Sequence, residues 1–172
     1  PADGASAAKL FHVALASDKP VYIRLTGNLN CPIAYKEDAL FAIGGSNKLR
    51  DGKDVTIIAC GTMVSTALAA AKKLAEEGIE ASVIDMYSIK PLDKQTIMEA
   101  KDSRLIVTLE EHSKMGGLGA AVAEVMCEET GFPRLLRLGI ADFFDLACDY
   151  DGLLSQNRLT APQIAEDILK AL

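Results

Sequence analysis

From residue 55 to the end of the chain, short apolar runs alternate regularly with amphipathic segments of helical length. The runs at 55–59, 81–89, 103–110 and 134–140 have the length and β-branched content of buried strands. Strands separated by helices require right-handed crossovers, which place helices on both faces of a mostly parallel sheet. The alternation therefore predicts an α/β fold, built as a three-layer α/β/α sandwich.

The predicted sheet has five strands, because a short strand precedes the first buried one. The stretch FAIGGSNKLRDGKD contains this strand and a polar turn at Asp51 and Gly52. Its position at the edge of the sheet makes it the candidate for antiparallel pairing. Between the strands we expect a helix ending near Gly78, a helix capped by Asp93 and a helix stopped by Gly131. Two short helices, DYDGLLSQN and TAPQIAEDILKAL, complete the chain.

The first forty residues do not continue this alternation. They contain a helical pattern at 5–18, a strand-like run PVYIRL at 20–25, and a stretch rich in Gly, Asn and Pro. A single helix and strand cannot bury both of their faces alone. We therefore expect residues 1–30 to be separate from a self-sufficient domain at 41–172, with a linker at 31–40.

Composition excludes several classes of function. The formal net charge of −6 and the scattered cations argue against a nucleic-acid or anionic-membrane surface. No apolar run is long enough to cross a bilayer, and no secretory signal is visible. We expect a cytoplasmic protein with free thiols and no metal site, because its four cysteines are far apart and form no CxxC pair. They are Cys31, Cys60, Cys127 and Cys148. The first residue is Pro1, which predicts a fragment or a trimmed product.

Two strand ends carry residues that weakly indicate a binding or catalytic site. Gly61 and Thr62 lead from a strand into a helix N-terminus, where free N–H groups can hold an anion. The lysine of a phosphate-binding P-loop is missing, so a structural turn with a threonine cap is the favoured interpretation. Asp85, at the end of the next strand, is interpreted as structural rather than catalytic.

The stretch LEEHSKMGGLGAAVAE, residues 109–124, combines acids, a histidine and glycines. Its glycines lack the third glycine of a GxGxxG dinucleotide fingerprint and lie outside a first βα turn. Glycines also allow a helix to start close against a sheet without any ligand. These residues alone do not decide between a ligand-binding loop and a structural junction of strand and helix. The loop or interface candidates are Glu111, His112, Gly116, Gly117 and Gly119.

Residues 40–172 resemble the C-terminal domain of the transketolase family. The resemblance is carried by CGTMVST after the first buried strand, by VIDMYSIKPLD, and by EEHSKMGGLG. It extends to split transketolases, 1-deoxyxylulose-5-phosphate synthase and the β subunits of 2-oxoacid dehydrogenases. PVYIRL resembles the last strand of the preceding pyrimidine-binding domain, so residues 1–30 are expected to be a remnant of that domain.

The family binds thiamine diphosphate and magnesium between a pyrophosphate-binding and a pyrimidine-binding domain. The resemblance implies that these two domains are the partners of this chain, with a homodimer contact as well. The GDG…N metal motif and the cofactor-activating glutamate are absent from the 172 residues. We therefore expect no cofactor bound by this chain alone, no catalytic residue in it, and a role in subunit assembly and at the substrate entrance.

One departure from the family concerns the substrate. Arg24 matches an arginine expected near the substrate channel, but the second arginine of the R-L-G-R-G pattern is replaced by Gly27. A guanidinium fork is hard to replace at a phosphate site, which counts against a standard pentose-phosphate substrate. Two alternatives differ in class: a nucleotide- or small-molecule-binding regulatory module that uses the GGLG turn, and an adaptor that docks another protein.

Overall fold

The protein is described by a computed structural model covering residues 1–27, 31–36 and 38–172. These residues form a five-stranded sheet with the order β1-β3-β2-β4-β5. Strands β2, β3, β4 and β5 are parallel, and β1 pairs antiparallel with β3 at one edge. Their bounds are Asn47–Arg50, Val55–Ala59, Ala81–Asp85, Leu105–Ser113 and Arg134–Ile140 in order of number. The predicted strand number, direction and edge pairing are confirmed.

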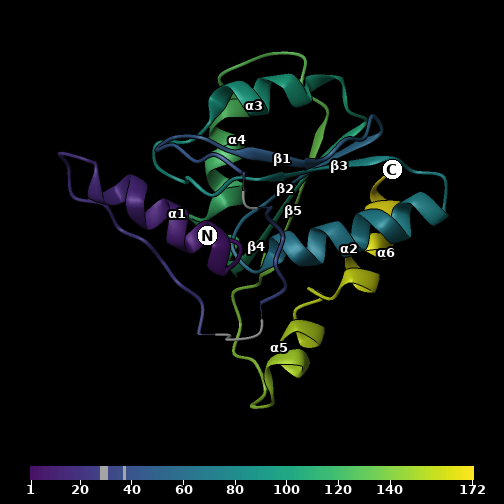
Figure 1. The fold of residues 1–172 in the computed structure, drawn as a ribbon. Helices are drawn as coiled ribbons and strands as arrows, with labels where there is room; N and C mark the ends of the chain where they lie inside the picture. The colour runs from purple at the N-terminus through teal and green to yellow at the C-terminus, as the bar shows by residue number, and fades with distance from the viewer. Residues whose placement is uncertain (28–30, 37) are drawn as a thin grey trace.

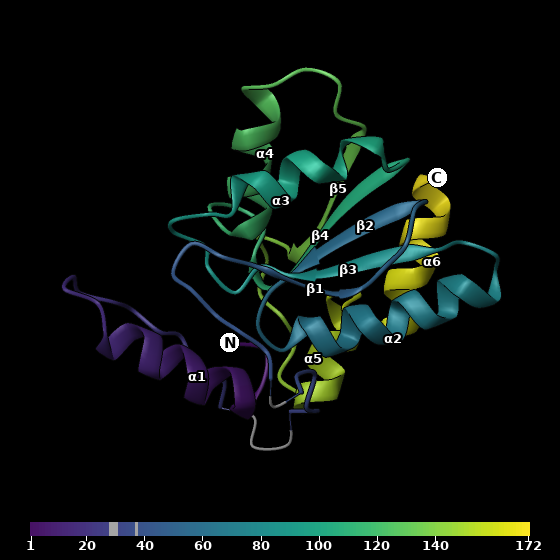
Figure 2. The ribbon, with the colours of Figure 1, turned by 45° about the horizontal axis from the view of Figure 1, so that its top comes forward.

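Helices cover both faces of the sheet (Figures 1 and 2). Helices α2 (Met63–Glu76) and α6 (Ala161–Ala171) pack on one face. Helices α3 (Lys94–Glu99) and α4 (Leu118–Cys127) cover the other, with a 3-10 turn at Ala100–Asp102. The three-layer sandwich predicted from the sequence is therefore correct.

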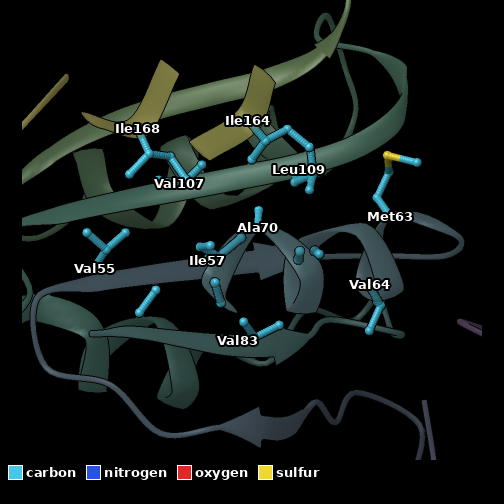
Figure 3. Packing of buried hydrophobic residues seen from close by; sticks show 14 of the residues in the cluster. Val55, Ile57, Met63, Val64, Ala70, Val83, Val107, Leu109, Ile164 and Ile168 are labelled. Carbon is cyan, nitrogen blue, oxygen red and sulfur yellow. The ribbon is translucent and has the colours of Figure 1, made fainter. Parts of the chain in front are cut away.

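The two faces of the sheet build two apolar cores. Because successive strand residues point to opposite faces, Ile57 packs toward α2 and α6 while Ile58 packs toward α4. Both side chains are fully buried, which explains why β2 carries apolar residues on both of its faces. Figure 3 shows the first core, in which Val107 and Leu109 of β4 lie beside Ile168 and Ile164 of α6, respectively.

Two helices lie outside the sandwich, at the carboxyl end of the parallel strands. Helix α1 (Gly4–Leu15) begins there and extends away from the sheet, and α5 (Tyr150–Gln156) follows β5 (Figure 1). In the described part of the chain, no helix is long and apolar enough to cross a membrane.

Two details of the sequence prediction were wrong. Residues 20–25 form no strand, because no described segment pairs with them to supply a ladder of hydrogen bonds. Helix α4 ends at Cys127, before Gly131, although Gly131 does adopt a positive φ of 84° in the following turn. The expected domain boundary at residue 30 and part of the expected linker at 31–40 fall on residues 28–30 and 37, which lie outside the described residues.

Candidate functional site

Polar side chains gather at the carboxyl end of the parallel strands. Ligands of open α/β sheets usually bind at this end. Asp85 ends β3, Gly61 and Thr62 join β2 to α2, and Glu110 and Glu111 lie near the end of β4. The hydrogen bonds that these groups make within the chain determine which of them remain available to a ligand.

Glu110 caps the N-terminus of α4. Its carboxylate accepts hydrogen bonds from the backbone N–H of Leu118 at 2.7 Å and of Gly119 at 2.8 Å. Glu110 is 2% exposed, so these two donors and the positive end of the helix take the place of water around its carboxylate. The amides that a GGLG turn would offer to an anionic ligand are thus occupied by the protein itself. Sequence reasoning missed this role, although an acid just before a glycine-rich helix start was visible.

The glycines of the loop fit closely around that carboxylate. A Cβ atom at Gly117 would overlap the Glu110 carboxylate, and one at Gly119 would lie 2.8 Å from the Thr108 hydroxyl. Gly116 has a φ of 74°, a left-handed conformation that favours glycine. Gly117 and Gly119 are therefore required by close packing, and Gly116 is favoured by its backbone conformation.

Glu111 points to the opposite face from Glu110, as strand alternation requires, and joins three segments. Its Oε2 atom accepts from the Thr62 hydroxyl at 2.5 Å and from the Tyr150 hydroxyl at 2.6 Å. Burial, together with the adjacent Glu111 carboxylate, raises the pKa of Tyr150 to about 12, so Tyr150 stays a donor at neutral pH. Thr62 occupies the N-cap position of α2, but its hydroxyl bonds to Glu111 and makes no cap. Sequence reasoning gave no signal for Tyr150.

Between Leu109 and Ser113 the pairing of β4 with β5 shifts: Leu109 pairs with Leu138, whereas Ser113 pairs with Ile140. The extra residues on β4 form an irregularity that contains both glutamates and His112. Such bulges re-aim side chains at the ends of strands. His112 is exposed, and its Nδ1 atom lies 3.0 Å from the carbonyl oxygen of Ser113.

A second cluster surrounds Asp85, which is fully buried. The Tyr35 hydroxyl donates to its Oδ2 atom at 2.6 Å, across fifty positions of sequence. Burial raises the pKa of Asp85 from 3.8 to about 6, against the opposing effects of the Tyr35 hydroxyl and the N-terminal amine. Tyr35 in turn packs against Phe41, with ring centroids 4.8 Å apart, and Phe41 packs against Tyr87 at 4.9 Å.

Two other predicted features lie near this end of the sheet. Arg24 is exposed, yet its positive charge reaches Cys60. Burial, Glu110 and Asp85 nevertheless raise the pKa of Cys60 to about 12, so its thiol is protonated and unreactive. Within the described ranges no cluster of three or more His, Cys, Asp or Glu side chains is placed to hold a metal ion.

Comparison with known proteins decides the family. A family model described as the transketolase C-terminal domain matches residues 44–164, which is more than half of the chain. The chain belongs to the transketolase C-terminal domain family. The resemblance inferred from the sequence motifs is thereby confirmed.

Individual relatives agree with this assignment. A putative transketolase C-terminal section of Methanocaldococcus jannaschii is 42% identical over 155 residues, covering 89% of this chain and 48% of that protein. A 6-deoxy-6-sulfo-D-fructose transketolase subunit of Clostridium sp. (strain MSTE9) is 40% identical over 165 residues, covering 95% and 51% respectively. The chain thus spans about half the length of the curated relatives that it matches.

A solved structure agrees over the whole chain. It is a split-gene transketolase, described as an inactive beta4 tetramer, with a TM-score of 0.94 and 41% identity, covering 100% of this chain and 56% of that one. A transketolase from Campylobacter jejuni shares the fold alone, with a TM-score of 0.66 and 16% identity.

Proposed function

We propose that this transketolase C-terminal domain acts as the non-catalytic section of a thiamine-diphosphate-dependent transferase that moves a two-carbon ketol unit. The observation that carries the proposal is the match of residues 44–164 to the transketolase C-terminal domain, together with the 0.94 TM-score to a split-gene transketolase. The pyrophosphate- and pyrimidine-binding domains would be its partners, and they would supply the sites for the cofactor and magnesium.

The contacts at the carboxyl end of the sheet support a structural role for this chain. Glu110 is used to cap α4, and Glu111 is used to tie α5 to the turn before α2. Because each of these two carboxylates already accepts two hydrogen bonds from the protein, Glu110 and Glu111 are poorly available for acid–base chemistry on a substrate.

Reconstitution tests this proposal. The chain, alone and with a transketolase partner subunit that carries the GDG…N motif, is titrated with thiamine diphosphate and Mg²⁺ in a calorimeter and assayed for ketol transfer. We expect no binding heat and no turnover for the chain alone, and both for the mixture. Micromolar cofactor affinity or turnover by the chain alone would refute the non-catalytic assignment. A mixture that binds cofactor without needing this chain for turnover would refute its role in the enzyme.

The N-terminal segment is proposed to be the end of a pyrimidine-binding domain, joined through a linker at 31–40. The support is its exposed apolar surface: Phe11 is 55% exposed, Leu15 67% and Tyr22 88%. Several large apolar side chains exposed on one segment are typical of a surface that contacts a neighbouring domain or subunit. In the assembled enzyme, we expect the amides around these residues to exchange hydrogen more slowly than in the isolated chain. Unchanged exchange on assembly would contradict this domain assignment.

The substrate class is proposed from Arg24 and Gly27. Arg24 would border the substrate channel, while a glycine at position 27 leaves no second guanidinium for a phosphate group. Among the described residues, no heavy atom lies within 4 Å of a Cβ placed at Gly27, so this position has open space for the start of a side chain. In the assembled enzyme, Gly27→Arg is expected to raise kcat/KM for phosphorylated sugars relative to unphosphorylated ones. An unchanged or reversed preference would show that these positions do not line the channel.

Self-association of this chain is proposed through the loop that contains His112. The exposed side chains of His112 and Met115 support it, as does the tetrameric assembly named for the split-gene relative. A symmetric contact uses the same loop from both copies, so one substitution changes the interface at two places. Sedimentation over a range of concentrations should show an oligomer that His112→Ala weakens and the matched control His12→Ala does not. A monomer at high micromolar concentration, or an oligomer indifferent to His112→Ala, would reject this contact.

A further inference from the structure

Two buried carboxylates hold Ala34 and Tyr35, within the segment 31–36, at the carboxyl end of the sheet. Asp3, the N-cap of α1, accepts from the backbone N–H of Ala34 at 2.7 Å and of Tyr35 at 3.1 Å. Asp85, the last residue of β3, accepts from the Tyr35 hydroxyl. The backbone of Tyr35 is therefore bound to the N-cap of α1, and its side chain is bound to the end of β3.

These contacts close the end of the sheet where a ligand of an α/β protein would bind. Asp3 and Tyr35 are 5% and 7% exposed, and Asp85 is 0% exposed. The ring of Tyr35 also packs on Phe41, so the segment is bound by apolar as well as polar contacts. We name residues 31–36, held by Asp3 and Asp85, the latch segment.

Asp85 is the poorly solvated member of this arrangement. Its Oδ1 atom is buried, and no hydrogen-bond donor in the described part of the chain reaches it. An ionised carboxylate with one donor and one unpartnered oxygen is costly to keep away from water. Moving Tyr35 away would let water reach both oxygens.

We propose that Asp85 makes the latch segment a proton-controlled device: it closes firmly over the sheet when the carboxyl group is neutral and opens more readily when it is ionised. Opening would free the carboxyl end of β2 and β3 and loosen the path of the chain between α1 and the sandwich. The neighbouring domain that we propose would then gain freedom to move relative to this one.

The direction follows from the groups that face Asp85. Burial raises its pKa to about 6; the Tyr35 hydroxyl and the Pro1 amine oppose the rise, and Asp3 adds to it. The other titratable neighbours, Cys60 on the β2 side and Tyr87 beyond β3, both have raised pKa values and remain neutral.

A raised carboxyl pKa means that the closed state binds the proton more tightly than the open one. Protonation of Asp85 therefore stabilises the closed state fully when the pH is below 3.8, the ordinary carboxyl pKa. This stabilisation is lost as the pH rises through about 6. If the open state has the ordinary pKa, linkage makes opening roughly tenfold more favourable at pH 7 than at pH 5.

Asp3 does not share this pH window. Burial acts to raise its pKa, but the donors from Ser6, Ala34 and Tyr35 outweigh burial and hold the pKa below 3.8. Asp3 therefore stays ionised between pH 5 and pH 7. A change in the opening of the latch segment over that pH range is then caused by titration of Asp85.

Hydrogen exchange of the Ala34 and Tyr35 amides tests the proposal. Protection factors, corrected for the intrinsic pH dependence of exchange, are measured at pH 5 and pH 7 in the wild type and in Asp85→Asn, which mimics the neutral acid. We expect roughly tenfold less protection at pH 7 in the wild type and no such loss in Asp85→Asn. The amides of Leu118 and Gly119, which donate to Glu110, are the internal control and should not follow this change.

Equal wild-type protection at the two pH values, or the same loss in Asp85→Asn, would overturn the proposal. Since Asp85→Asn could fail to fold, the carboxyl carbon of Asp85 is also titrated by NMR in the wild type. A midpoint near 6 supports the device, whereas a midpoint near 3.8 overturns it independently of any variant.

Discussion

Glu110→Ala should destabilise the folded protein, because the Glu110 carboxylate caps α4. This substitution removes two charge-assisted hydrogen bonds and leaves the N–H groups of Leu118 and Gly119 buried without partners. Hydrogen bonds to charged groups contribute about 1.5–3 kcal/mol each, and loss of a helix N-cap costs about 0.5–2 kcal/mol. Because these two estimates describe the same contacts, we expect a total loss of about 3–5 kcal/mol. Glu110→Gln keeps the volume and one acceptor oxygen, so it should lose about half as much.

Urea denaturation followed by circular dichroism measures these differences, with thermal unfolding as a second readout. For a chain of this size each kcal/mol lowers Tm by about 2–4 °C, so Glu110→Ala should lower it by about 10 °C. The control is Glu128→Ala, at the other end of α4, where an ion pair with Lys94 is largely exposed. That pair should be worth less than about 0.5 kcal/mol. If Glu110→Ala costs no more than about 1 kcal/mol beyond this control, the capping role is refuted.

Two further predictions use the same denaturation measurement. Gly117→Ala should cost at least about 2 kcal/mol, because its Cβ overlaps the carboxylate that caps α4, whereas Gly27→Ala meets open space and should change stability by less than about 0.5 kcal/mol. A Gly117→Ala protein as stable as Gly27→Ala would contradict the close packing. Thr62→Val and Tyr150→Phe each remove one donor to Glu111 and should cost about 1 kcal/mol singly. Because both donors share one oxygen, the double variant should depart from the sum of the single ones, and strict additivity would argue against a shared contact.

Local sequence patterns were enough to predict the layers, the five strands of the sheet and the presence of the six α-helices that the described residues form. Periodicity is a local property, so the continuous apolar run at β2 predicted a central strand buried on both faces. Asp93 was correctly expected to cap α3, because a cap joins residues three positions apart, here Asp93 and Thr96. The family also followed from local motifs, since they lie at the strand–helix junctions that the fold repeats.

Tertiary structure alone decided which polar groups meet at the carboxyl end of the sheet. Glu110 and Glu111 are adjacent in sequence, yet one caps α4 and the other holds Thr62 and Tyr150, because β4 sends them to opposite faces. Tyr35 and Asp85 are fifty positions apart, and no local pattern brings them together. The run at 20–25 failed as a strand for the same reason: its residues favour extended structure, but a strand exists only where a neighbouring strand supplies hydrogen bonds, and that neighbour is chosen by the whole fold.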